Sequence, residues 1–281
     1  MAEEVATSTL RDSHLAVLRM ITARIRTERH PPTTFSAMSN TAEDAQTPDP
    51  LRYPGEVAAR EPDRAAVVMA TSGEVITYAE LDDMANRLSQ LFRAAGLERG
   101  DHVAFCMENR AEFLPIAWGC HYAGLYYTAI SSRLTSEEVE YIVNDCGAQA
   151  FITTPYKAEA ASAIMESTPN VRVRLAVGGH VEGHESFEDA IAGQPSEPIA
   201  DRMEASDMLY SSGTTGQPKG VKVTAPDVPL GTPPALLMLL AMLFGVTDGC
   251  KYLSPAPLYH AAPLRFCMNV QRVGGTVVVM E

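Results

Sequence analysis

The stretch MLYSSGTTGQPKG, from Met208 to Gly220, decides how the rest of the chain is interpreted. Apolar residues lead into a block of serine, threonine and glycine that ends at Pro218 and Lys219. Glycines allow backbone conformations in which successive N–H groups point into one concavity and bind an anion, and hydroxyls and a lysine add donors. The stretch therefore predicts a polyphosphate-binding loop between two strands. The alternative is a hydrophilic hairpin turn with a surface lysine.

Two common nucleotide-binding motifs are absent from the sequence. The P-loop has Gly-Lys-Ser/Thr starting five positions after its first glycine. Pro218 occupies that position after Gly213, and Val221 occupies it after Gly216. No G-x-G-x-x-G follows a predicted strand, so the nicotinamide and flavin fingerprint is missing as well.

Composition indicates a globular and acidic protein. The chain has 281 residues, a net charge of -13, 46% hydrophobic residues and 20% charged residues. The acidic balance argues against a general nucleic-acid binder, which needs a basic face. Five cysteines without a C-x-x-C pair predict reduced thiols, most of them in the core, in a cytoplasmic protein. They are Cys106, Cys120, Cys146, Cys250 and Cys267. The opening MAEEVATSTLRDSH lacks the apolar centre of a secretory signal.

The most apolar run of the chain is PPALLMLLAMLFGV, residues 233–246. It is shorter than the ~20 residues that a membrane-spanning helix needs. We therefore predict a buried helix and no transmembrane span. The alternative is that its methionines and leucines line an apolar ligand channel.

Residues 1–50 are interpreted as an extension and linker, separate from a domain over residues 51–281. The segment DSHLAVLRMITARIRTERH, residues 12–30, has the spacing of a short basic amphipathic helix, and a polar, proline-containing linker follows it. We interpret the extension as dispensable and largely disordered. The alternative is a docking helix or a membrane-surface anchor.

From Leu51 onward the pattern alternates between strands and helices. Thr77 with Glu80, and Thr135 with Glu138, form capping boxes that predict two helix starts. Strands separated by helices of this length predict an α/β fold with parallel or mixed sheets covered by helices on both faces. The chain ends just after the run GGTVVVM, residues 274–280. We expect this run to be an exposed final strand, and we interpret the chain as a truncated version of something longer.

Several segments resemble the adenylate-forming (AMP-binding) superfamily, which includes acyl-CoA synthetases, luciferases and peptide-synthetase adenylation domains. YSSGTTGQPKGV resembles its phosphate-binding signature, and YLSPAPLYHAAP resembles a later motif beside the acyl site. Residues 76–113 and 133–153 resemble its first structural units. The resemblance covers residues 51–281 and is closest to the N-terminal portion of a fatty-acyl-CoA synthetase. It implies the N-terminal part of the large domain of these enzymes.

The resemblance implies a reaction and a set of site residues. Such enzymes join a carboxylic acid to ATP in the presence of Mg²⁺, release pyrophosphate, and pass the acyl group to coenzyme A. Lys219, which would help pyrophosphate leave, and His260, which would lie near the acyl carboxylate, are the implied catalytic residues. The implied phosphate-binding residues are Ser211, Ser212, Gly213, Thr214, Thr215, Gly216 and Lys219. No metal ligand is assigned.

The sequence departs from the family pattern in two places. Ala225 follows Thr224 where the family commonly has histidine. The family's adenine, ribose and Mg²⁺ contacts and its C-terminal lysine lie later in its chains, so we expect that this chain cannot complete adenylation alone. One alternative is a non-catalytic remnant, or a half-enzyme whose partner chain supplies the missing part. Another is a ligase for aryl or amino acids.

One histidine pair is a weaker candidate for a metal site. His180 and His184 are four residues apart, as two ligands on a helix would be. The glycines around them argue for a loop, and Val181 stands where a zinc protease has glutamate. We therefore predict a solvated loop here.

Overall fold

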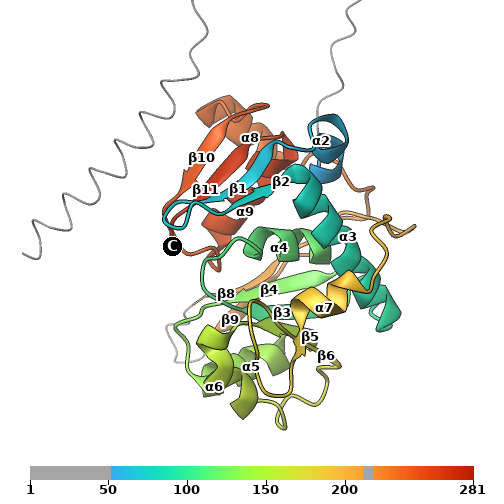
Figure 1. Ribbon diagram of the computed structural model, residues 1–281, viewed down its shortest axis with the longest axis vertical. Coiled ribbons are helices and arrows are strands. Elements are labelled where there is room, and N and C mark those ends of the chain that lie inside the picture. Colours follow the sequence, from blue (N-terminus) through green and yellow to red (C-terminus); the bar gives the residue numbers. More distant parts are fainter. Residues whose placement is uncertain (1–51, 212–217) are drawn as a thin grey trace, which may run out of the picture. The chain divides into compact units, whose positions relative to one another are not determined.

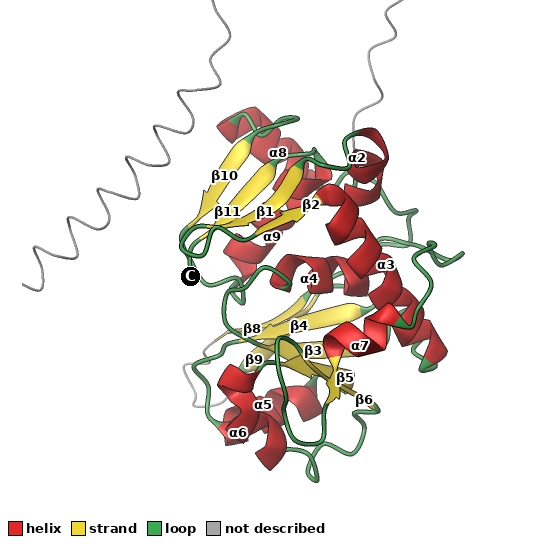
Figure 2. Cartoon of the chain, viewed as in Figure 1, coloured by secondary structure: helices red, strands yellow, loops and turns green. Residues whose placement is uncertain are grey.

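The computed structural model describes residues 52–211 and 218–281. All of these residues fall within one compact unit, residues 49–281. The predicted extension over residues 1–50 lies outside the described residues, so the division of the chain at residue 50 stays a prediction. Helices and strands alternate along the described chain (Figure 2), as the sequence pattern predicts.

Five parallel strands form one sheet, in the order β4-β3-β5-β6-β7. Their bounds are β3 His102–Cys106, β4 Tyr126–Ile130, β5 Ala148–Thr153, β6 Val173–Ala176 and β7 Glu185–Ser186. All five residues of β3 are buried, as expected for an apolar strand in the middle of a parallel sheet.

Helices cover both faces of this five-stranded sheet. Val103 and Phe105 of β3 pack into one core, and Ala104 and Cys106 pack into the other, because side chains alternate along a strand. The first core includes residues of α3 Tyr78–Ala94, α4 Phe113–Tyr122 and α7 Phe187–Ala192. The second core includes residues of α5 Ser136–Asp145 and α6 Ala158–Ala163, and the turn η1 Pro155–Lys157 precedes α6.

Four strands form a second, mixed sheet in the order β10-β11-β1-β2. Their bounds are β1 Ala65–Met69, β2 Val75–Thr77, β10 Lys251–Ser254 and β11 Thr276–Val279. Only the β1–β2 pair is antiparallel among the described strands of this sheet. The helices that accompany this sheet are α2 Pro54–Arg60, α8 Ala235–Phe244 and α9 Ala261–Arg272. Helix α4 contacts α9 and lies between the two sheets (Figure 1).

The capping boxes predicted from the sequence are present. The Thr77 hydroxyl accepts a hydrogen bond from the backbone N–H of Glu80, and the Glu80 carboxylate accepts one from the backbone N–H of Thr77. Thr135 and Glu138 do the same at the start of α5. Both helices therefore begin where local chemistry directs them.

The prediction that β11 is an exposed final strand is wrong. β11 pairs in parallel with β10 on one side and with β1 on the other, and Val277 and Val279 are fully buried. Helix α9 connects β10 to β11, so that the two strands lie side by side. On its other side β11 pairs with β1, which comes about two hundred residues earlier in the chain. Local sequence could not reveal this long-range pairing.

The prediction that helices cover both faces of a sheet is correct for the five-stranded sheet but not for the four-stranded sheet. A row of side chains runs across the four-stranded sheet in register, from Leu253 through Val278 and Val68 to Val75. Leu253 and Val75, at the two ends of the row, are 46% and 47% exposed. The described residues therefore leave this face partly open, whereas the opposite face packs into the core.

The prediction of a buried helix over residues 233–246 is also wrong for most of its surface. In α8, Leu237 and Leu240 are buried, but Met238 is 67% exposed and Met242 is 76% exposed. Helix α8 buries only one stripe because the described residues do not surround it. It contacts α9, and Phe244 of α8 lies 6.3 Å from Phe266 of α9 between ring centroids.

A buried ionic cluster joins α4, α9 and the loop segment that holds Glu204. The Glu204 carboxylate accepts hydrogen bonds from Arg272 at 2.6 and 3.0 Å, from the ring Nε2 of His121 at 2.8 Å, and from the backbone N–H of Gly231 at 2.8 Å. Burial by itself raises the pKa of Glu204, but the bonds from His121 and Arg272 outweigh it and lower the pKa to about 2. Burial, with Arg272 nearby, lowers the pKa of His121 and keeps its ring neutral.

Replacing Glu204 with glutamine tests whether this cluster holds the two sheets together. Glu204→Gln removes the negative charge opposite Arg272 and leaves a buried guanidinium uncompensated. We expect the free energy of unfolding to fall by about 3–5 kcal/mol, the usual cost of breaking a buried ion pair from one side. Urea unfolding followed by circular dichroism measures it. Glu98→Gln, at an exposed site, is the matched control. Equal midpoints for the two variants would contradict the expectation.

Candidate functional site

The two strands on either side of the Ser/Thr/Gly block in the sequence form an antiparallel pair, called here the β8–β9 hairpin. β8 Met208–Ser211 pairs with β9 Lys219–Lys222, and Ser211 stands opposite Lys219. Both of these residues are exposed. The prediction that two strands flank the block is confirmed. Residues 212–217 lie outside the described residues, so the predicted phosphate-binding positions Ser212, Gly213, Thr214, Thr215 and Gly216 stay predictions.

Gly220 has a packing reason to be glycine. A Cβ atom at this position would lie 2.6 Å from Cε of Met208 and 2.8 Å from Cζ of Tyr210, its cross-strand neighbour. The Tyr210 hydroxyl donates a hydrogen bond to the carboxylate of Asp145, at the end of α5. Burial and this bond both raise the pKa of Tyr210. The side chain that occupies the space above Gly220 therefore also ties the hairpin to α5.

The hairpin lies against the edge of the five-stranded sheet. Asp207, just before β8, forms a parallel bridge with Tyr127 of β4, and β4 and β8 are in contact. Because β8 runs parallel to β4, Ser211 lies toward the carboxyl end of the sheet. Ligands of parallel α/β sheets bind at this end.

A second lysine anchors β9 to the sheet. Nζ of Lys222 lies 2.9 Å from Nε2 of His102 and 4.3 Å from the ring centroid of Tyr126. The imidazole of His102 stacks on the same tyrosine, with ring centroids 4.8 Å apart. Burial and the nearby Lys222 ammonium lower the pKa of His102 to about 4. A neutral His102 can accept a hydrogen bond from Lys222, whereas a protonated ring would repel it.

His260 stands at the start of α9, where the chain leaves the carboxyl end of β10. It is exposed, and its ring lies 4.5 Å from that of Tyr259 between centroids. Asn109, which follows β3, holds this region in place. Its Oδ1 accepts a hydrogen bond from the backbone N–H of Leu258 at 2.8 Å, and its Nδ2 donates to the carbonyl of Met280 at 2.7 Å.

Asn109 therefore brings the carboxyl ends of β3, β10 and β11 together, and places His260 at the same end of the five-stranded sheet as Ser211. Sequence reasoning missed this role. The available signal was a polar residue three positions after a buried strand, where parallel sheets commonly hold ligands.

A further ion pair connects the hairpin with α9. Arg265 donates to Asp207 through Nε at 3.0 Å and through Nη2 at 2.7 Å. Asp207 is buried, and the two hydrogen bonds raise the pKa of Arg265. Sequence reasoning did not single out either residue, because they are 58 positions apart and neither belongs to a motif.

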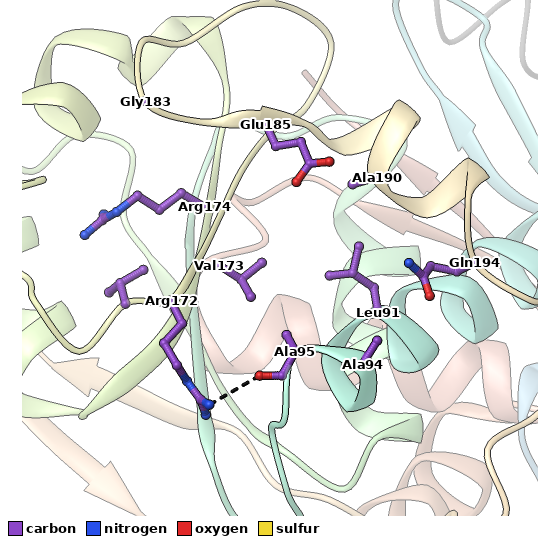
Figure 3. Close-up of a pocket in the computed structure, with 11 residues that line it drawn as sticks. Leu91, Ala94, Ala95, Arg172, Val173, Arg174, Gly183, Glu185, Ala190 and Gln194 are labelled. Atoms are coloured by element: carbon purple, nitrogen blue, oxygen red, sulfur yellow. Dashed lines mark hydrogen bonds between the residues drawn. The ribbon is translucent and has the colours of Figure 1, made fainter.

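One cavity of the described structure lies elsewhere. It has a volume of about 470 Å³ and is lined by residues of α3, β6, β7 and α7 and their flanking loops, including Leu91, Val173 and Glu185 (Figure 3). Arg172, at its rim, donates a hydrogen bond to the carbonyl of Ala95 (Figure 3). The lining includes none of Ser211, Lys219 and His260. This cavity is therefore separate from the predicted site.

The prediction of a solvated loop around His180 and His184 is correct for His180, which is exposed, but wrong for His184. His184 is buried, and its Nδ1 lies 3.0 Å from the carbonyl oxygen of Glu182. Burial lowers the pKa of His184, which keeps the ring neutral. Within residues 52–211 and 218–281, no group of three His, Cys, Asp or Glu side chains could hold a metal ion.

The cysteines are free thiols, and four of the five are buried, with Cys250 half-buried. Burial raises the pKa of Cys106 and of Cys267 to about 12 and that of Cys146 to about 11. These side chains are protonated at neutral pH and do not act as nucleophiles there. Among the helices that the structure describes, none has the length and apolar character needed to cross a membrane.

Comparison with known proteins identifies a family. A family model described as AMP-binding enzyme matches residues 55–281. A feruloyl-CoA synthase from an Amycolatopsis species is 29% identical over 215 residues, which cover 76% of this chain and 40% of that protein. The long-chain-fatty-acid–CoA ligase FadD13 of Mycobacterium tuberculosis is 29% identical over 211 residues, covering 73% of this chain and 40% of that protein. The chain thus spans about two fifths of the length of the curated relatives it matches.

Solved structures agree with this assignment. The N-terminal domain of FACL13 from M. tuberculosis has a TM-score of 0.68 at 25% identity, with 81% of this chain and 56% of that chain covered. The anthranilate CoA ligase AuaEII, solved with anthranoyl-AMP, has a TM-score of 0.67 at 25% identity, with 82% and 45% covered. The prediction of an α/β fold from the N-terminal part of this superfamily is confirmed.

The anchor between His102 and Lys222 predicts a pH dependence. The pKa of His102 is about 4 in the folded state, against an ordinary value of 6.5, so the unfolded chain binds more protons between these two pH values. The stabilisation is complete above pH 6.5 and is lost as pH falls through 4. We expect the thermal midpoint to decline over this range. His102→Gln keeps an acceptor for Lys222 but cannot titrate, so its midpoint should decline less steeply. If the thermal midpoints of the wild type and of His102→Gln fall equally with pH, the contact between His102 and Lys222 is not the cause of the decline.

Proposed function

The chain belongs to the AMP-binding enzyme family, and on this premise we propose that it takes part in the ATP-dependent activation of a carboxylic acid. The observation that carries the proposal is the sequence signature from Tyr210 to Val221, whose described ends pair as β8 and β9 beside a parallel sheet, with Ser211 opposite Lys219 toward the carboxyl end of that sheet. Successive N–H groups, hydroxyls and one ammonium in such a loop suit a polyphosphate.

The proposed chemistry has two steps. A carboxylate oxygen of the acid attacks the α-phosphorus of ATP and forms an acyl-adenylate, while the bond to the β-phosphate oxygen breaks and pyrophosphate leaves. The sulfur of coenzyme A then attacks the acyl carbon, its thiol proton is released, and AMP leaves. Both reactants of the first step are anions, so neutralisation of charge is the main task of the site.

Lys219 is the proposed residue for that neutralisation. Its ammonium would contact the β- and γ-phosphates together with Ser211, Ser212, Gly213, Thr214, Thr215 and Gly216. As the bond to the β-phosphate breaks, negative charge grows on pyrophosphate, and a lysine that follows this charge stabilises the transition state.

His260 is the proposed residue on the acid side. Its exposed ring lies at the start of α9 and can donate a hydrogen bond to the acyl carboxylate. Because Ser211 and His260 both lie at the carboxyl end of the five-stranded sheet, the proposal places phosphate and carboxylate on one side of the fold.

Mg²⁺ is proposed to accompany ATP. The described residues contain no cluster of carboxylate, histidine and cysteine side chains that could hold it. They do not fit a protein-held metal, and no step is assigned to the ion.

We propose a fatty acid as the substrate. Met238 and Met242 form an exposed apolar face on α8, a helix that contacts α9, and such a face suits an alkyl chain. An aryl acid is the second candidate, since one relative is a feruloyl-CoA synthase.

Lys219→Ala tests the phosphate site. We expect the folded wild-type chain to bind Mg-ATP and the variant to bind it about tenfold or more weakly, because a hydrogen bond to a charged group contributes ~1.5–3 kcal/mol. Isothermal titration calorimetry measures this difference. Lys251→Ala removes the same charge from the other sheet and should bind normally. A wild-type chain that is folded but does not bind ATP would overturn the proposed function.

His260→Ala tests the acid site. We expect this variant to keep its affinity for Mg-ATP, because the ring faces the carboxylate rather than the phosphates. Calorimetry with fatty and aryl acids on the ATP-loaded chain should give tighter binding of fatty acids, and weaker binding of both to the variant. Tighter binding of aryl acids would favour the second candidate, and unchanged acid binding would remove His260 from the site.

A further inference from the structure

We propose that Asp207 and Arg265 are positioning residues that set the place of Lys219 relative to His260. This inference rests on the proposed function, because it concerns the coupling between the phosphate side and the acid side of that site. The pair joins the β8–β9 hairpin to α9, the two elements that carry these residues.

The pair stands where the hairpin joins the five-stranded sheet. The backbone of Asp207 is bridged to Tyr127 of β4, and its carboxylate is buried. From this point β8 runs directly to Ser211, the residue opposite Lys219. Any shift of Asp207 along the sheet is therefore passed along the strand toward Lys219.

The other half of the pair belongs to the second sheet. Arg265 lies five residues after His260, which is ~7.5 Å along a helix. Helix α9 connects β10 with β11, so its position follows the four-stranded sheet. A rotation of α9 would carry Arg265 and His260 together.

The geometry of the pair distinguishes it from an ordinary surface ion pair. Two nitrogens of one guanidinium reach both oxygens of one carboxylate, at 3.0 and 2.7 Å, and such a bidentate contact fixes orientation as well as distance. The side chain of Asp207 is only 10% exposed, which limits screening by solvent. By contrast, Arg99 contacts Asp227 through one nitrogen, and the side chain of Asp227 is 86% exposed.

Binding of phosphate at Lys219 should therefore change the position of the His260 ring. Movement of β9 on binding ATP passes through β8 and Asp207 to Arg265, and from there along one and a half turns of α9 to the ring of His260. Without the pair, the hairpin and α9 remain folded on their own sheets, but the two ends of the site respond independently.

Histidine-selective NMR of the whole chain during titration with Mg-ATP tests this coupling, with His260→Gln identifying the His260 signal. We expect the wild-type His260 signal to shift with the same midpoint as ATP binding. Asp207→Asn and Arg265→Met should still bind ATP but lose most of the shift. The double exchange Asp207→Arg with Arg265→Asp should recover part of it, and Asp227→Asn, which breaks the exposed pair, should keep all of it.

The outcomes separate the two proposals. ATP binding with an unchanged His260 shift in Asp207→Asn and Arg265→Met would overturn the positioning role and leave the proposed function standing. ATP binding that never shifts the wild-type signal would do the same. A folded wild-type chain that does not bind ATP would overturn the proposed function, and the positioning role with it. A purely structural pair would lower the thermal midpoint but leave the response of His260 to ATP intact.

Discussion

The arrangement of the two sheets depends on one buried carboxylate. Glu204 belongs to the segment that leads into the hairpin, yet its partners are on α4, on α9 and at Gly231. A charge in a dry interior is tolerated only when it is paired and fully hydrogen-bonded, so the four groups specify each other's positions. The aromatic ring of Trp118 lies beside the same guanidinium and also donates to Gln271 of α9. The contact between the sheets is thus polar at its centre and apolar around it.

Other polar residues of the same segment also bond to helices. Arg202 contacts Asn86 of α3, Glu204 contacts α4 and α9, and Asp207 contacts α9. Within six residues the chain is therefore bonded to three helices, and it then enters β8. The strand that leads toward Lys219 therefore begins from a firmly held base. Binding residues are commonly carried on segments that a rigid scaffold positions.

Local chemistry decided the elements that the sequence predicted correctly. The capping boxes at Thr77 and Thr135 act within four residues, and the buried strands are continuous apolar runs, so both are visible in the sequence. The signature from Tyr210 to Val221 predicted the flanking strands and the family for the same reason. Lys219 and His260 were found through motifs, and their roles rest on the resemblance.

Only the tertiary structure decided how residues far apart in the sequence lie relative to one another. The run from Thr276 to Val279 gives no sign that β1 lies beside it, and the apolar run of α8 does not tell which of its faces will find a neighbour. No sequence motif marks Asn109, Asp207 or Arg265. Their roles become visible only in the fold, where they form hydrogen bonds with partners 58 to 171 positions away. The sequence by itself determined the elements and the family, because these follow from short-range patterns. Folding alone decided the sheet order, the buried ion pairs and the common end on which Ser211 and His260 lie, because hydrogen bonds and packing act through space and not along the chain.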